Sequence, residues 1–244
     1  MNGIVWFDGK SIEYEYKKEK RKTLSVRIND DGTVTVKAPK WVTNGEIKRF
    51  VDERAEWIFK KSETARRHLE EKKKSYRNGD IHICLGKEYR LEIEKAACDR
   101  IKELPDGVIH IKTTDDSEDE VRKRLSRLWY KKLKEYALEQ IELYMPLIKG
   151  YAIRNNISMK EMTGLTIRNV KSRWGSCSSR GHINLNVKLI AADTDIVDYV
   201  IVHEMCHLMY MNHSKDFWMA VEYVFADYKE LRKLLRDNGW RYEI

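Results

Sequence analysis

The stretch that decides how this chain folds is His203-Glu204-Met205-Cys206-His207, which matches the pattern H-E-x-x-H. Histidines four positions apart lie on one face of a helix, with Cβ atoms ~5–6 Å apart, so both imidazoles can reach one Zn²⁺ ion. Glu204 lies one step around the helix from His203. Its carboxylate therefore misses the metal but can act as the base that activates a metal-bound water.

The residues around this segment indicate that it is buried. Most residues from Ile196 to Met211 are apolar or aromatic, namely Val197, Tyr199, Val200, Ile201, Val202, Met205, Cys206, Leu208, Met209 and Tyr210. A helix that is apolar on all sides is usually buried, and burying two histidines and a glutamate without partners is costly. A metal supplies the partner; the alternative is a core cluster held together by hydrogen bonds.

A third metal ligand is expected downstream, and two residues compete for the role. His213 follows His207 by six residues, which is the step that metzincins use in H-E-x-x-H-x-x-G-x-x-H. Tyr210 occupies the glycine position of that pattern, and Asn212 is the residue that can adopt the left-handed conformation instead. The rival ligand is Glu222, on the next predicted helix. The spacing favours His213.

Short strands and turns dominate the first half of the sequence. Asp8-Gly9, Asp30-Asp31-Gly32, Gly86-Lys87 and Pro105-Asp106-Gly107 are turn signals. They separate strands predicted at 4–7, 11–16, 23–28, 33–37, 81–85, 89–93 and 108–112. Thr43 and Glu46 form a capping-box pattern that begins a helix, which becomes basic over Lys60–Lys74. We expect no internal repeat.

Helices dominate the second half. The first is predicted to begin at Ser117, with Glu120 as its capping partner, and to end at Pro146 and Gly150. Short strands follow at 165–170, 172–177 and 182–186. Further helices are expected from Asp193 or Thr194 to Met209, from Ser214, and from Asp227 to Arg236. The domain boundary is predicted at 112–118, giving a β-rich domain over 1–115 and a second domain over 116–244.

The composition limits the compartment and the partners. The chain has 244 residues, a net charge of +8 and a pI of about 9.1. We expect no secretory signal. No apolar run reaches the ~18–20 residues that a membrane span needs, and the sequence has no C-x-x-C pair. The four cysteines, Cys84, Cys98, Cys177 and Cys206, are therefore expected to be reduced in the cytoplasm. Residues 1–80 hold 20 Lys+Arg against 14 Asp+Glu, which indicates a nucleic-acid partner or a solvated basic helix.

Several further motifs surround the H-E-x-x-H segment and carry a family resemblance. They are Arg173-Trp174-Gly175-Ser176-Cys177, Ile183-Asn184-Leu185-Asn186, Asp198-Tyr199-Val200, Asn212-His213-Ser214 and Phe217-Trp218. Together they resemble the YgjP-like metal-dependent hydrolases, which are zincin relatives of SprT-like proteases; only Met205, where leucine is common, departs from the pattern. The resemblance implies a metal held by His203, His207 and His213. It also implies an α+β fold, in which a β-rich N-terminal region precedes a compact zincin-like helical core with a short β-meander.

The leading hypothesis is a zinc-dependent metallopeptidase with one Zn²⁺ per chain. Glu204 takes a proton from the attacking water and passes it to the leaving amine. The strand His182–Asn186 is expected to pair with an extended peptide or protein substrate. Tyr210, Tyr199 and Arg173 are the candidate donors to the developing oxyanion. The possible substrate-binding residues are Arg173, Trp174, Asn186 and Tyr210.

Two other hypotheses remain open. The resemblance also allows a nucleotide pyrophosphatase, in which Arg173 and Lys171 hold phosphate and Trp174 stacks on a base. Mg²⁺ or Mn²⁺ would suit that chemistry better than Zn²⁺. The third hypothesis is a nucleic-acid-binding protein with structural zinc, with Cys177 as the only candidate fourth ligand.

Overall fold

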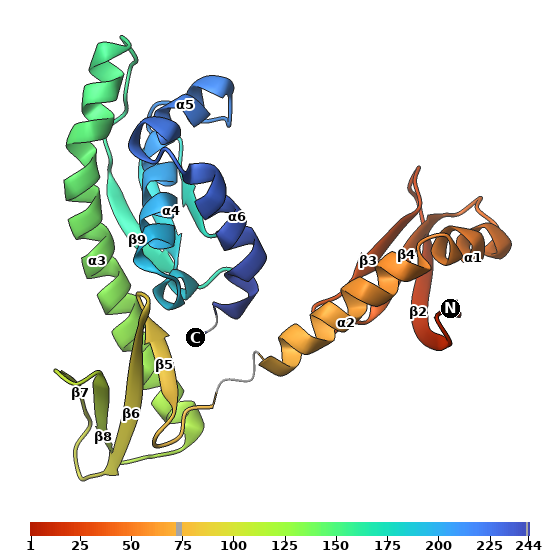
Figure 1. Ribbon diagram of the computed structural model, residues 1–244, viewed down its shortest axis with the longest axis horizontal. Helices are drawn as coiled ribbons and strands as arrows, with labels where there is room; N and C mark the ends of the chain where they lie inside the picture. The colour runs from red at the N-terminus through yellow and green to blue at the C-terminus, as the bar shows by residue number, and fades with distance from the viewer. Residues whose placement is uncertain (72–74, 243) are drawn as a thin grey trace. The chain divides into compact units, whose positions relative to one another are not determined.

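A computed structural model describes residues 1–71, 75–242 and 244, with the backbone alone at positions 68, 70 and 71. The chain divides into two compact units, Met1–Lys73 and Lys74–Ile244, each with its own buried core (Figure 1). The predicted basic helix reached Lys74, and its last residues, Lys72–Lys74, lie outside the described part. The α+β class with a β-rich N-terminal region is confirmed.

The first unit is a four-stranded sheet covered by two helices. Its strands are β1 (Asn2–Phe7), β2 (Lys10–Glu19), β3 (Ser25–Ile28) and β4 (Val34–Pro39), in the order β1-β2-β4-β3. The predicted Asp8-Gly9 turn joins β1 and β2, with positive φ at both residues as a tight hairpin requires. Alternating side chains such as Val5, Ile12 and Val36 point into the core.

The helices of this unit are α1 (Asn44–Asp52) and α2 (Ala55–Glu71). The predicted capping box is present: the Glu46 backbone N–H donates to the Thr43 hydroxyl, and the Thr43 N–H donates to the Glu46 carboxylate. The sequence pattern predicted one continuous helix. The structure breaks it at Glu53–Arg54, and Ile47, Val51 and Ile58 of the two pieces are buried in the core of this unit.

The second unit begins with another four-stranded sheet. Its strands are β5 (Ile81–Cys84), β6 (Lys87–Lys95), β7 (Arg100–Leu104) and β8 (Val108–Thr113), in the order β5-β6-β8-β7. β7 was not predicted, because it is a largely exposed edge strand with little apolar alternation. This order repeats that of the first sheet, so the prediction of no internal repeat was wrong at the level of topology.

The long helix α3 (Glu118–Arg154) links this sheet to the rest of the unit. The prediction that it ends near Pro146 was wrong. Proline removes one helical hydrogen bond, but the apolar stripe continues to Ile148 and Ala152, which are buried and hold the last two turns in place. The domain boundary predicted at 112–118 falls inside the second unit. Residues on both sides of it, from Ile111 to Leu125, belong to one buried hydrophobic cluster.

The remaining elements build the centre of the unit. They are β9 (Gly164–Arg168), β10 (Gly175–Cys177), β11 (His182–Asn186), η1 (Val187–Ala191), α4 (Thr194–Cys206), α5 (Lys215–Val224), α6 (Tyr228–Asn238) and η2 (Gly239–Arg241). The strand order is β10-β11-β9, with β9 and β11 parallel. β11 is therefore central, which a simple meander would not produce. Among the described helices none is long and apolar enough to cross a membrane.

Candidate metal centre

The helix that carries the H-E-x-x-H segment is held on all sides. Ten of the thirteen residues of α4 are buried, and the helix packs against α3, α5 and α6. Asp198 ties it to α3 through two hydrogen bonds, donated by the hydroxyls of Tyr136 (2.7 Å) and Tyr144 (3.0 Å). Burial raises the pKa of Asp198, against the effect of these two donors. This clasp fixes the position of α4 along α3.

Three histidines meet at the C-terminal end of α4. His203 lies in its last turn, His207 caps it, and His213 lies just before α5. One ring nitrogen from each lies within 4.8 Å of the other two, and the Nε2 atoms of His203 and His213 are 3.0 Å apart. Two ligands of a tetrahedral zinc ion are about 3.3 Å apart for Zn–N bonds of ~2.0–2.1 Å. The arrangement therefore has the dimensions of a three-histidine metal site.

The hydrogen bonds of these rings also fit a metal. His207 Nδ1 donates to the Tyr210 carbonyl at 2.8 Å, which leaves Nε2 as the ligand atom. His203 Nδ1 is buried without a hydrogen-bond partner in the described structure. Burial and the neighbouring histidines lower the pKa of His203 to about 3, and burial lowers the pKa of His207. Neutral imidazoles are the protonation state that binds metal.

Aromatic side chains from α5 close one side of the site. Phe217 is fully buried, and its ring centroid lies 4.6–4.9 Å from those of all three histidines. Trp218 stacks on His213 at 5.6 Å. Ser214 begins this helix by accepting a hydrogen bond from the Phe217 backbone N–H, as the sequence predicted. The rings therefore exclude water from one side of the histidines and fix their orientation.

Glu204 is held beside this group in an apolar environment. It is 5% exposed, and burial raises its pKa to about 8. Arg173 and the Cys177 backbone N–H, which donates to the carboxylate, partly oppose this shift. Oε2 has no hydrogen-bond partner in the described structure. The raised pKa makes the ionised form of Glu204 a stronger base, and the unsatisfied Oε2 is the atom that would accept a proton from a water molecule beside the histidines.

Gly175 explains how the sheet approaches this carboxylate so closely. A Cβ atom built on Gly175 would lie 2.5 Å from Glu204 Oε1 and 2.7 Å from its Cγ. Only glycine therefore allows β10 to lie directly against the Glu204 side chain. Because side chains alternate along a strand, Ser176 points to the opposite face of the sheet, where Asn184 donates to it.

We expect Gly175→Ala to lower kcat/KM for the hydrolytic reaction by about 10²-fold, since displacing a catalytic group by about 1 Å has that effect. The added methyl must displace Glu204, because the three atoms nearest to it all belong to that side chain and none to a histidine. Metal content should therefore be unchanged. The matched control is Ser176→Ala, which should retain activity. Equal activity in both variants would show that the position of Glu204 is not critical.

Two other residues that the sequence suggested for the metal site, Glu222 and Asn212, do not have the predicted roles. Glu222 is exposed and lies outside the histidine group, so the geometry favours His213 as the third ligand. Asn212 does not have the positive φ suggested for it; among described residues other than glycine only Asp8, Leu85 and Asn156 do. The chain instead turns back through the turn at 207–209, where Leu208 and Met209 bond to carbonyls of the last turn of α4.

The residues predicted to bind substrate, Arg173, Trp174, Asn186 and Tyr210, differ in their contacts within the fold. Asn186 is buried, and its amide donates to the carbonyls of Val170 and Arg173, so it braces the loop before β10. Trp174 packs edge-on against Tyr242 at 5.7 Å. Arg173 is exposed and near Glu204, and the Tyr210 carbonyl orients His207. The strand β11 cannot pair with a substrate as predicted, because β9 and β10 occupy both of its edges.

A pocket of ≈ 310 Å³ lies beside β10. Its polar lining includes Arg168, Arg173, Ser176 and Asn184. Ser176 and Asn184 point to the face of the sheet away from Glu204, so the pocket extends behind the edge strand. Arg168 was not predicted as a site residue, and neither were the roles of Gly175 and Phe217, although Gly175 and Phe217 are part of the motifs around the H-E-x-x-H segment.

Comparison with known proteins agrees with this geometry. Residues 22–238 match the family described as YgjP-like, metallopeptidase domain. The chain is also similar to the metallopeptidase zymogen of Pyrococcus abyssi abylysin, known from a crystal structure, with 22% identity and a TM-score of 0.32. That likeness covers 43% of this chain and 93% of the other. No curated protein matches the sequence.

Proposed function

Because the chain belongs to the YgjP-like metallopeptidase domain family, and its members are metal-dependent peptidases, we propose that it is a zinc peptidase whose general base is Glu204. The observation that carries this proposal is the pairing of one buried, unsatisfied carboxylate with three converging histidines. A structural zinc site usually closes with a fourth protein ligand. Within the described residues the group contains three, which leaves one position for a reacting molecule.

The residues have separate roles in the proposed reaction. His203, His207 and His213 would hold the zinc ion, and a bound ion supplies Lewis acidity that acidifies water and polarises a carbonyl group. Glu204 accepts the proton of the attacking water at Oε2 and later transfers it to the departing amine nitrogen. Phe217 excludes bulk water from one side. Gly175 and the Cys177 N–H hold the carboxylate in place.

An extended peptide is the substrate that the neighbouring strand suits best. Among the described strands β10 (Gly175–Cys177) pairs with β11 alone. Its other edge is therefore open to a substrate strand, except that the Cys177 N–H already donates to the Glu204 carboxylate. A peptide added at this edge would pass close to Glu204, since Gly175 contacts that side chain. Arg173, exposed at the start of β10, is the proposed oxyanion donor in this arrangement.

A nucleotide pyrophosphatase is the second candidate. The pocket that contains Arg168 and Arg173 could hold a phosphate group through bidentate hydrogen bonds. Its position behind β10 makes it a poor partner for Glu204, which lies on the opposite face. Trp174 packs against Tyr242 and is therefore not free to stack on a base from both faces.

The test is to remove the metal and then restore activity. Protein stripped with a chelator and supplied with Zn²⁺, Mg²⁺ or Mn²⁺ is incubated in parallel with a quenched fluorescent peptide library, unfolded proteins and nucleoside triphosphates. We expect peptide cleavage that returns with Zn²⁺, and no release of phosphate or pyrophosphate. Nucleotide hydrolysis restored by Mg²⁺ or Mn²⁺, without peptide cleavage, would favour the second candidate, because phosphates prefer hard cations.

A further inference from the structure

The two four-stranded sheets are copies of one structural plan. Each has a hairpin, a parallel crossover and a second hairpin, in the orders β1-β2-β4-β3 and β5-β6-β8-β7. The registers also agree when Gly9 is matched with Gly86 and Gly32 with Gly107. Corresponding pairs are Val5↔Ile12 with His82↔Tyr89, Tyr14↔Val34 with Leu91↔Ile109, and Val26↔Val36 with Ile101↔Ile111. The second sheet therefore serves as an internal reference for the first.

The two copies differ sharply in charge at one end. In the first sheet, β2 and β4 are parallel and finish side by side, with Glu19 paired to Pro39. The segments at this end, 17–22 and 37–41, carry seven basic residues and one acidic residue. The matching segments of the second sheet, 94–99 and 112–116, carry two basic and four acidic residues. The plan itself therefore does not require positive charge here.

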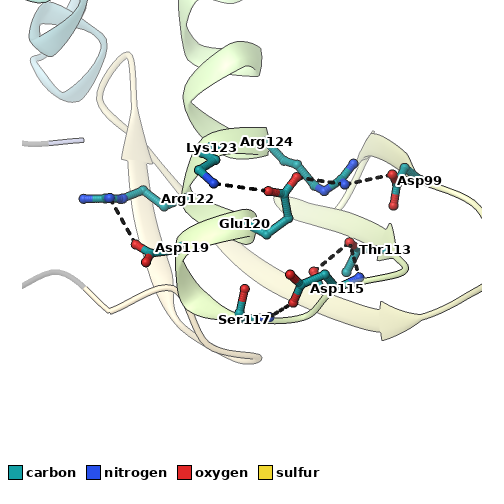
Figure 2. Close-up of polar contacts among 9 residues, drawn as sticks. All are labelled: Asp99, Thr113, Asp115, Ser117, Asp119, Glu120, Arg122, Lys123 and Arg124. Atoms are coloured by element: carbon teal, nitrogen blue, oxygen red, sulfur yellow. Dashed lines mark hydrogen bonds and ion pairs between the residues drawn. The ribbon is translucent and has the colours of Figure 1, made fainter.

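The charges of the second sheet are used within the fold (Figure 2). Asp99 binds Arg124 of α3 at 2.8 Å, and Arg124 also binds Glu120 at 2.9 Å. The Asp115 carboxylate accepts from the Ser117 backbone N–H and holds the start of α3. Two of the four acidic residues, Asp99 and Asp115, thus anchor the following helix, and the other two, Glu94 and Asp116, pair with Lys112 and Lys95 of the same segments.

The charges of the first sheet are not used in this way. Lys17 and Lys37 bind the carboxylates of Glu15 and Glu19 on the same sheet. In the part of the chain that the structure describes, no ion pair involves Lys20, Lys22 or Lys40. Trp41, where the second sheet has Asp116, is 74% exposed. Lys18 interacts with Glu46 in the first turn of α1. The exposed Trp41 and the three lysines without an ion pair, Lys20, Lys22 and Lys40, have no comparable role in the described structure.

We propose that this basic end of the first sheet, formed by residues 17–22 and 37–41, binds single-stranded nucleic acid. Lysine and arginine side chains would contact successive phosphates, and the Trp41 ring would stack on an unpaired base. Insertion into a lipid surface is less suitable, because a helix that lies in the membrane interface presents a continuous apolar face, whereas Trp41 is the only large apolar side chain in the two segments. This inference concerns the first unit and does not depend on the peptidase proposal.

The test measures fluorescence anisotropy of labelled single-stranded oligonucleotides with the full chain over a range of salt concentrations. Lys20→Glu, Lys22→Glu and Lys40→Glu together should weaken binding at least about tenfold, and should reduce the salt-dependence slope by about 2, since each lost phosphate contact contributes ~0.7. Trp41→Ala should weaken binding by about fivefold to a hundredfold, as expected for one lost stacking contact. Glu204→Gln should not change binding.

The matched control is Lys131→Glu, Lys134→Glu and Lys149→Glu, which makes the same change in net charge on exposed positions of α3. It should bind nearly as tightly as the wild type, and thermal unfolding should show that both triple variants remain folded. If the two triple variants bound the oligonucleotide equally weakly, the loss would result from the change in net charge alone, and the proposal would be overturned. The absence of binding at low salt, or binding only to vesicles that contain phosphatidylserine, would also overturn it.

Discussion

Replacing His203 or His213 by alanine is expected to abolish zinc binding, which should amount to about one ion per chain in the wild type. Each histidine supplies one of three ligand atoms that lie within 4.8 Å of one another. With two protein ligands left, the affinity falls below what survives purification and dialysis. The measurement is the metal content of freshly purified protein, followed by a zinc titration of the stripped protein.

Glu222→Ala is the matched control, because Glu222 is the rival ligand and lies exposed on α5. It should keep its zinc. Thermal unfolding gives an independent readout, since a ligand at about 1,000 times its Kd stabilises the folded state by ~4.1 kcal/mol. Saturating zinc should therefore raise the Tm of the wild type and of Glu222→Ala only. Loss of zinc from Glu222→Ala with retention in His213→Ala would reverse the ligand assignment.

Glu204→Gln should lower kcat/KM for peptide cleavage by about 10²–10⁴-fold, the usual contribution of a general base. The amide has nearly the same shape, so it fits against Gly175 and still accepts the Cys177 N–H, but it cannot take a proton from water. The zinc content should equal that of the wild type. This combination separates a lost base from a lost metal, and it is measured by assaying zinc-loaded variants side by side.

The control for this variant is Glu222→Gln, the same substitution at an exposed position outside the histidine group. Its activity should match that of the wild type. Residual activity of Glu204→Gln within about threefold of the wild type would exclude Glu204 as the base.

Local patterns in the sequence predicted much of this molecule. The capping box at Thr43, the hairpin at Asp8-Gly9 and the cap at Ser214 depend on residues within four positions of one another, and all three form. The capping box predicted at Ser117 was wrong: Ser117 makes no side-chain cap bond, and Glu120 pairs with Lys123 and Arg124 instead. The two histidines of H-E-x-x-H share one helix face by the same local geometry. His213 was predicted as a ligand from its distance of six residues after His207, and the structure brings its ring next to those of His203 and His207.

Predictions failed where distant contacts override local preference. α3 continues through Pro146 because Ile148 and Ala152 are buried in the core. The duplicated sheets were missed because their shared features are turn glycines and alternating apolar positions, while the residue types in between differ. The short patterns around Asp8-Gly9-Lys10 and Leu85-Gly86-Lys87 were the available signal.

The sequence by itself thus determined which residues can bind a metal and act as a base, since that chemistry follows from residue type and helical spacing. Only the tertiary structure decided how those residues are held. Gly175 lies against Glu204, Asp198 is clasped by α3, and β10 rather than β11 has a free edge. These contacts join segments from 29 to 62 residues apart, and only packing determines which distant side chains meet.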